Sequence, residues 1–256
     1  MERRLYSIAL IVFLVAASLT LTSARMMSSV MPMPGGWTMG MAWMRMPGQT
    51  RLAAGGMFAG MWLAMMVMMM LPSSLPMLLL YRRLAITRGE PRADLLVWVM
   101  AASYFFVWTM FGIAAYLVGT VIAEATMQST LISRTIPVAA GGALVAAGLY
   151  QLTPWKMACL AHCRNPLMLL SHHAQRPGWR SGAALGLHHG LFCTGCCWAL
   201  MVMQLVLGVM NLTAMIVVAT VIALEKLLPE GEQLARLVGV GSIASGVWLM
   251  ARVVMS

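Results

Sequence analysis

The chain has 256 residues, of which 61% are hydrophobic and only 9% are charged, against roughly 25% charged residues in an average soluble domain. This composition excludes an ordinary soluble enzyme, a disordered chain and a charged coiled coil. The formal net charge of +10 comes from 17 basic residues against 7 acidic ones. Because the basic residues stand in short clusters between apolar runs, without an aromatic-basic face, we expect membrane lipid and no nucleic acid as the partner.

Apolar runs divide the whole chain. A spanning helix needs about 20 mostly apolar residues, and such runs lie at roughly 5–24, 52–80, 94–119, 136–153, 184–210, 212–228 and 234–255. We therefore predict an all-α fold, a polytopic transmembrane helix bundle of about seven spans within a single integral membrane domain over residues 1–256. The run 136–153 is short and the turn around Asn211 is tight, so six spans or a re-entrant segment is the alternative. The first run is too long for a typical signal peptide, which favours a retained anchor.

The distribution of basic residues predicts the orientation. Loops on the cytoplasmic side of a membrane protein carry an excess of Lys and Arg. With a cytoplasmic N-terminus, the inner side contains Arg3, Arg4, Arg82, Arg83, Arg88, Arg92, Lys156, Arg164, Arg176, Arg180, Lys226 and Arg236. The outer side then has only Arg25, Arg45, Arg51, Arg134 and Arg252. We therefore expect a multi-pass protein whose N-terminus is cytoplasmic.

The predicted outer loop, residues 25–51, is rich in methionine, proline, glycine and tryptophan. A thioether is neutral at every pH and remains a soft ligand where thiols would oxidise, so methionine clusters suit the capture of Cu(I) outside the cytoplasm. The alternative is a loop that lies on the bilayer surface with its tryptophans at the headgroup level. The candidate Cu(I)-capturing ligands of this loop are Met31, Met33, Met39 and Met41.

Methionines also recur at every fourth position of the second span. Met61, Met65 and Met69 therefore share one face of a helix. Such a stripe more often serves packing than metal transfer, but here it follows the methionine-rich loop, so we keep a relay of Cu(I) as a hypothesis. Pro72 and Pro76 are expected to kink or end this helix.

Two groups of cysteines and histidines stand at helical spacing. The first lies in a predicted inner loop, residues 154–183, and the second in the following span. Within each group the side chains recur three or four residues apart and share a helix face. If the two faces meet, they form a closed cage of sulfur and nitrogen ligands, which we predict as a metal site. The candidate ligands are Cys159, His162, Cys163, His188, His189, Cys193, Cys196 and Cys197.

This set of donor atoms leaves more than one chemistry open. Two or three thiolates suit Cu(I), the metal that we expect, whereas four ligands in a tetrahedron suit zinc or an iron-sulfur centre. Cys193 and Cys196 form a C-x-x-C motif, so a membrane thiol-disulfide oxidoreductase is an alternative. The predicted cytoplasmic location of these cysteines disfavours it, because disulfides do not persist there.

Two features lie near this second group. Gly182, Gly186 and Gly190 are four residues apart, which allows another helix to approach closely. Glu225 and Lys226 close the sixth run. Either the pair only extends its charges to the inner surface, or Glu225 is a counter-charge or partner for a histidine ligand. No Ser/His/Asp arrangement or phosphate-binding loop can be assembled, so we predict no catalytic residue and no enzyme.

Several sequence blocks resemble a known family. The most specific is HHGLFCTGCCW at 188–198, and the others are GGWTM, MWLAMM, LPSSLP, CLAHCRNP and EKLLP. From about residue 35 to 250 the chain resembles the bacterial family of uncharacterised, predicted metal-binding integral membrane proteins. The resemblance implies a polytopic fold in a bacterial inner (cytoplasmic) membrane and metal binding, with matching positions at Cys159, Cys163, His189, Cys193, Cys196 and Cys197.

The leading functional hypothesis is a membrane protein that handles Cu(I) as a chaperone, a transporter or a cuproenzyme assembly factor. Its expected partners are membrane lipid and a cuproenzyme or other membrane subunits. The alternatives are a metal-containing structural subunit of a larger membrane complex and the thiol-disulfide oxidoreductase.

Overall fold

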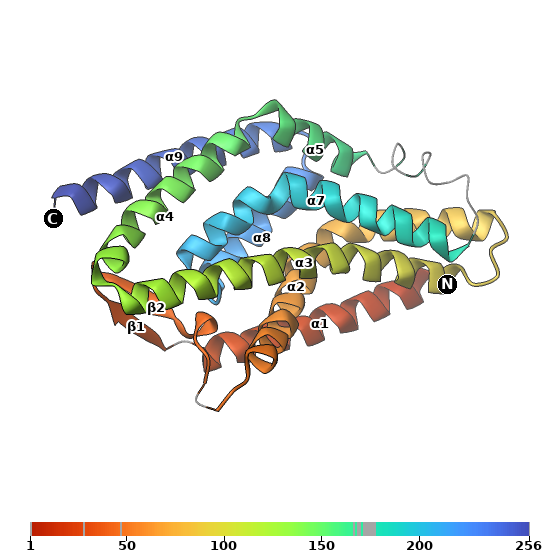
Figure 1. The fold of residues 1–256 in the computed structure, drawn as a ribbon. Helices are drawn as coiled ribbons and strands as arrows, with labels where there is room; N and C mark the ends of the chain where they lie inside the picture. The colour runs from red at the N-terminus through yellow and green to blue at the C-terminus, as the bar shows by residue number, and fades with distance from the viewer. Residues whose placement is uncertain are drawn as a thin grey trace.

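The computed structural model describes residues 2–27, 29–46, 48–165, 167, 170 and 178–255. It is a bundle of long α-helices with one short β-hairpin (Figure 1), which confirms the predicted fold class. The elements in chain order are α1 (Glu2–Met26), β1 (Val30–Met33), β2 (Trp37–Gly40), the 3-10 helix η1 (Met41–Trp43), α2 (Arg51–Thr87), α3 (Ala93–Gln128), α4 (Thr130–Gln151), α5 (Pro154–Arg164), α7 (Trp179–Leu207), α8 (Leu212–Leu227) and α9 (Gly231–Met255).

Six of the described helices, α1, α2, α3, α4, α7 and α9, are long and apolar enough to cross a membrane. The remaining candidate, α8, has only 16 residues. Figure 1 shows the N-terminus and the C-terminus at opposite ends of the bundle. With α8 counted as a seventh, shorter traverse the number is odd, which agrees with this separation of the termini. The choice between the predicted seven spans and the six-span alternative depends on this helix.

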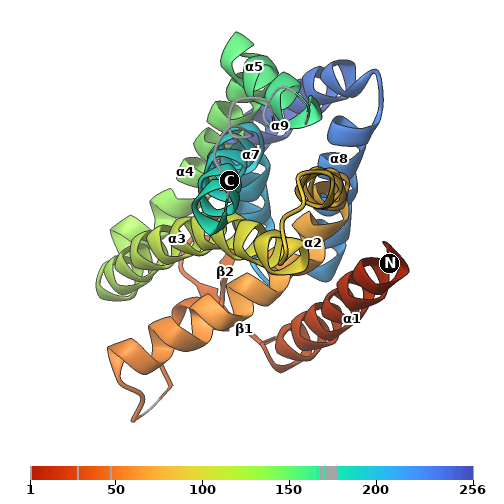
Figure 2. The same cartoon turned by 90° about the vertical axis from the view of Figure 1, so that its right-hand side faces the viewer.

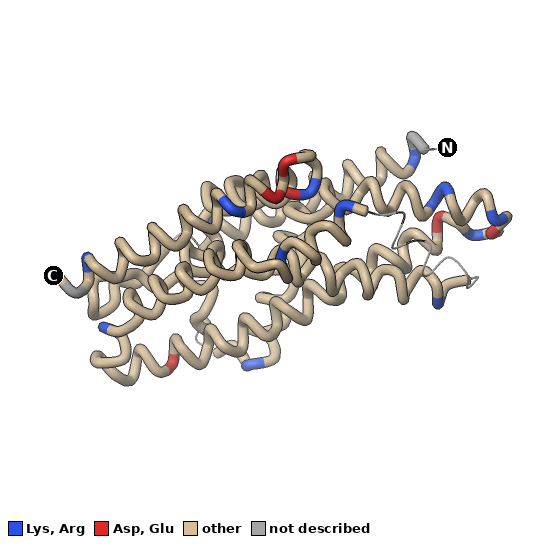
Figure 3. The backbone as a smooth tube through the Cα atoms, turned by 90° about the horizontal axis from the view of Figure 1, so that it is seen from above, with Lys and Arg blue, Asp and Glu red and all other residues tan. Residues whose placement is uncertain are grey.

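The two ends of the bundle differ. We term the end with β1, β2 and the C-terminus the hairpin end, and the end with the N-terminus and the turn at residues 88–92 the N-terminal end. Figure 3 shows that the charged residues gather mostly near the ends of the helices, which leaves long stretches without charge between them. Among the basic residues assigned above to the inner side, Arg176 lies outside the described residues.

Both predicted loops contain secondary structure. In the loop at residues 25–51, β1 and β2 pair as an antiparallel hairpin, and Gly35 and Gly36 adopt the positive φ angles that its turn requires. Trp37 Nε1 donates a hydrogen bond to the Ser133 carbonyl oxygen at 2.9 Å, which anchors the hairpin to α4. In the loop at residues 154–183, α5 starts because the Thr153 hydroxyl caps it and Pro154 occupies its first turn.

Two prolines lie inside α2 rather than at its end. Pro72 and Pro76 each lack the N–H that would continue the helical hydrogen bonds. Figure 2 shows that α2 changes direction partway along its length. Of the two expected outcomes, a kink or an end, the structure has the kink.

Helix α7 packs closely on α3 through three glycines. A Cβ atom on Gly186 would collide with the backbone oxygen of Met100, and one on Gly190 would lie 2.9 Å from Cγ2 of Val107. Gly182 likewise faces α3, where a Cβ would lie 3.0 Å from the Leu96 oxygen. The close approach predicted from the glycine spacing is thus confirmed. Its consequence is that Cys193 of α7 lies next to Tyr104 of α3.

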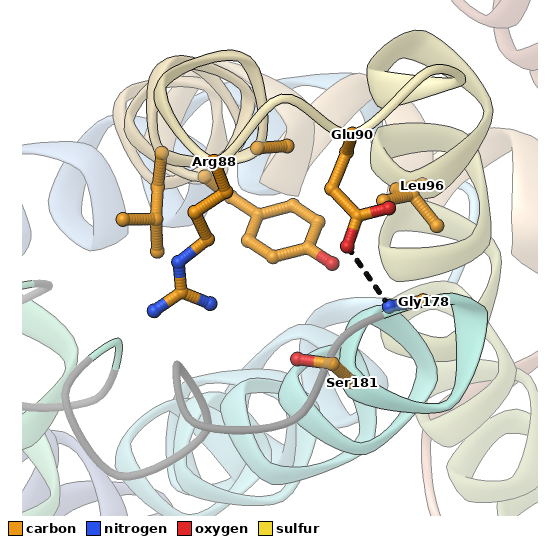
Figure 4. A pocket seen from close by; sticks show the side chains of 8 residues that line it. Arg88, Glu90, Leu96, Gly178 and Ser181 are labelled. Atoms are coloured by element: carbon orange, nitrogen blue, oxygen red, sulfur yellow. Dashed lines mark hydrogen bonds between the residues drawn. The ribbon is translucent and has the colours of Figure 1, made fainter.

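Polar contacts connect the helices at the N-terminal end. The Glu90 carboxylate accepts a hydrogen bond from the backbone N–H of Gly178 at 3.1 Å, and Figure 4 shows this contact beside a small pocket that also includes Arg88. The buried Arg82 donates to Asp94 at 2.6 Å. Arg82 and Glu90 therefore join α2, α3 and α7 where the bundle meets its loops.

Candidate metal centre

Four cysteines come together where α5 meets α7. Cys193, Cys196 and Cys197 of α7 are buried, with their sulfur atoms within 4.8 Å of one another. They share one face because they stand at i, i+3 and i+4 of a helix. Cys163 of α5 adds a fourth sulfur, 3.7 Å from that of Cys196. We term these four residues the thiol cluster; all of them are free thiols.

Cys159 lies beside the thiol cluster, one turn earlier on α5. Its sulfur packs against Gly195, where an added Cβ would lie only 3.1 Å away. Burial raises the pKa of the Cys159 thiol, and the nearby ammonium of Lys156 opposes this rise. The structure therefore brings together four of the predicted cysteine ligands and places the fifth against the helix backbone.

The sulfur of Cys193 has two polar neighbours from other helices. Lys226 of α8 donates to it at 3.0 Å, and the Tyr104 hydroxyl of α3 lies 2.9 Å from it. Lys226 also donates to the Ser73 hydroxyl of α2 at 3.3 Å. An ammonium favours the thiolate, which is the form of cysteine that binds metals. Lys226, counted above among the basic residues of the inner side, thus points to the cysteines rather than to a loop.

A buried ion pair supports the cluster from the other side. Lys156 has no exposed surface; its ammonium lies 2.6 Å from the Glu225 carboxylate and also donates to the backbone oxygen of Cys196. Burial disfavours this ammonium, but the neighbouring Cys197 and Glu225 outweigh the effect and raise the pKa of Lys156. Gln151 completes the group by donating to Glu225 at 3.1 Å.

This ion pair gives Glu225 a partner other than the histidine for which it was a candidate: its charged partner is Lys156. Lys156, counted above among the basic residues of the inner side, is wholly buried. The signal in the sequence was a single lysine two residues after a helix-starting proline, next to an apolar run. It could not reveal which carboxylate the lysine would meet.

The histidines are arranged differently from the cysteines. His162 of α5 and His188 of α7 lie side by side, with their ring centroids 5.5 Å apart. Phe192 stacks on His162 at 3.9 Å, whereas His189 stacks on Tyr104 at 5.2 Å. Among the described residues, the close group of donor atoms contains the three sulfurs of α7 and no histidine nitrogen.

The predicted stripe of Met61, Met65 and Met69 is buried in the same apolar core as the cysteines of α7. We term these three residues the methionine stripe. The next position at the same spacing is Ser73, which contacts Lys226. One face of α2 thus carries the methionine thioethers and then Ser73. The Lys226 ammonium that contacts Ser73 also donates to Cys193.

The methionines of the hairpin gather on one side of it. Met31 pairs with Met39 across the two strands, and Met33 follows Met31 by two residues, so the three side chains share one face. Met39 is buried, whereas Met31 is exposed. Met41 begins η1 directly after β2 and is partly buried.

The fold and the site together define an integral membrane protein of helical-bundle type with a buried, sulfur-rich centre suited to a soft metal ion. Residues 59–249 match the family model described as PpoB2, copper chaperone. This match covers more than half of the chain, so the chain belongs to the PpoB2 copper chaperone family. No curated protein sequence and no solved structure matches it. The family supports the copper-related part of the resemblance noted from the sequence.

Proposed function

We propose that this protein binds Cu(I) as its cargo in the thiol cluster and passes it on as a membrane-embedded copper chaperone. The observation that carries the proposal is the meeting of four sulfurs from α5 and α7 in a site where Lys226 contacts a sulfur directly. Cu(I) is a soft ion that thiolates bind in two- or three-coordinate geometry. A group of four close sulfurs offers it more ligands than it needs at once, so the ion can exchange one sulfur for another.

Membership of the family favours copper over the alternatives of zinc and an iron-sulfur centre. It also favours metal transfer over catalysis and over a purely structural role in a larger complex. A chaperone must release its cargo, and a site that joins separate helices suits release better than a rigid cage does. The two helices that meet at the site are α5, which has 11 residues, and the longer α7.

The methionines supply a route for the ion in this proposal. Cu(I) is captured at the hairpin face of Met31, Met33 and Met39, and the methionine stripe relays it toward Cys193. Thioethers bind Cu(I) more weakly than thiolates do, so transfer toward the thiol cluster is favourable. With the hairpin end outside a bacterial inner membrane and the N-terminus in the cytoplasm, the acceptor is a cuproenzyme or another membrane subunit.

The test is a Cu(I) titration of the detergent-purified protein, under reducing and anaerobic conditions, against a chromophoric chelator. We expect about one tightly held Cu(I) per chain, lost in the variant Cys193→Ser/Cys196→Ser/Cys197→Ser. Cys159→Ser is the matched control, because its sulfur lies against Gly195 and outside the close group. Unchanged copper in the triple variant, or zinc or iron in place of copper in the purified protein, would contradict the proposal.

A further inference from the structure

The pair of His162 and His188 faces a different side of the α5–α7 contact from the thiol cluster. Successive residues of a helix turn by about 100°, so the side chain of His162 points roughly at a right angle to that of Cys163. Five residues separate His188 from Cys193, which turns their side chains apart by about 140°. The same five residues place His188 about 7.5 Å nearer to the start of α7, and that start lies at the N-terminal end.

The two imidazoles have the separation that a shared ion needs. Their ring centroids are 5.5 Å apart and their planes differ by 23°. Two imidazole nitrogens bound at about 2.0 Å to opposite sides of one ion place their ring centroids roughly 6 Å apart. The rings are stacked, so an ion between them requires each imidazole to rotate until one of its nitrogens faces the other ring.

One nitrogen of the pair is buried and unsatisfied. Nε2 of His162 has no hydrogen-bond partner within the described part of the chain, and a buried polar atom without a partner costs free energy. The ring of Phe192 covers the pair, at 3.9 Å from His162 and 4.9 Å from His188. This aromatic cover keeps water from one side of the imidazoles, so the His162 nitrogen has little access to a water partner on that side.

We propose that His162 and His188 form a second metal site, a two-imidazole station for Cu(I) between the thiol cluster and the N-terminal end. The inference rests on the proposed function for the identity of the ion, but not for the existence of the site. Neutral imidazoles hold Cu(I) less tightly than thiolates do, so an ion at this station is more easily given up. The station is a weaker site through which Cu(I) passes from the thiol cluster to an acceptor at the N-terminal end, and transfer is completed because that acceptor binds the ion more tightly than the cluster does.

The experiment compares copper stoichiometry and copper X-ray absorption for four proteins loaded with excess Cu(I) and then desalted. They are the wild type, the variant His162→Gln/His188→Gln, the variant Cys163→Ser/Cys193→Ser/Cys196→Ser/Cys197→Ser, and the combination of both. We expect the cysteine variant to keep copper with nitrogen ligands only, and the combined variant to lose it. Equal copper in the cysteine variant and the combined variant, or none in the cysteine variant, overturns the second site.

The same series separates this inference from the proposed function. If the cysteine variant keeps the full copper content of the wild type, the thiol cluster is wrong while the histidine site stands. A titration that avoids cysteine changes guards against misfolding: the second equivalent of Cu(I) added to the wild type should give nitrogen coordination, and the single variant His188→Gln should lack it. Identical spectra for these two proteins would overturn the inference.

Discussion

The Nζ atom of Lys226 lies 3.0 Å from the Sγ atom of Cys193, so that a cation from α8 contacts a thiol of α7 inside the bundle. A charge taken out of water is costly unless it has partners, and here the partners are the thiol and the Ser73 hydroxyl of α2. Lys226 thereby joins the end of the methionine stripe to the thiol cluster. Its charge is one feature of the site that favours an anionic sulfur at Cys193, beside the neighbouring thiols.

Replacing Lys226 with methionine tests this role. We expect the Lys226→Met protein to fold but to bind Cu(I) at neutral pH about tenfold more weakly, since a thiol that loses its cationic partner must give up its proton at a higher cost. The measurement is competition with a Cu(I) chelator over a range of pH. Lys226→Arg keeps the positive charge and serves as the control, so equal affinities for the Met and Arg variants would show that the charge is irrelevant.

The two cysteines of α5 should behave differently. Cys163→Ser removes a sulfur that lies 3.7 Å from Cys196, and we expect the affinity for Cu(I) to fall at least about tenfold, which corresponds to roughly 1.4 kcal/mol. Cys159→Ser should change the affinity less than about twofold, within the range of a surface-like substitution. Both are measured by the same chelator competition. A larger loss of affinity from Cys159→Ser than from Cys163→Ser would show that Cys159, and not Cys163, is the cysteine of α5 that binds Cu(I).

The buried pair of Lys156 and Glu225 should stabilise the fold as a unit. Removal of one partner leaves an uncompensated buried charge, so Lys156→Met or Glu225→Leu alone should cost about 3–5 kcal/mol of unfolding free energy. The double variant should cost less than the sum of the two single variants, because no lone charge remains. Denaturant-induced unfolding in detergent measures this double-mutant cycle. Strictly additive losses would mean that the two side chains act independently.

The contact between α3 and α7 should tolerate no added carbon at its centre. Gly186→Ala brings a Cβ against the Met100 oxygen, so we expect a loss of about 1–3 kcal/mol from overpacking. Gly142→Ala in α4 is the matched control: nothing lies within 4 Å of its added Cβ, and alanine favours a helix by about 1 kcal/mol over glycine. Thermal unfolding in detergent should shift the two variants in opposite directions. A stabilised Gly186→Ala protein would contradict the packing.

Much of the fold was predictable because a membrane-spanning helix can be recognised from a continuous stretch of neighbouring residues. The length of each apolar run and the four-residue spacing of Gly182, Gly186 and Gly190 are properties of neighbouring residues, and the structure confirms the helical bundle and the close helix contact. The ends of the helices were less well predicted. Helix α2 continues past Pro72 and Pro76 to Thr87, because a helix buried among others survives the loss of single hydrogen bonds.

Local spacing also identified residues that bear soft ligands, but it could not decide which of them meet. By itself, the sequence determined the class of fold, the abundance of sulfur and the helical faces on which the cysteines and methionines stand. Only the tertiary structure decided that Cys163 joins the α7 cysteines, that Glu225 pairs with Lys156, and that Lys226 reaches Cys193. The physical reason is that a helix face is fixed by periodicity along the chain, whereas contacts between faces depend on how whole helices are displaced and rotated against one another.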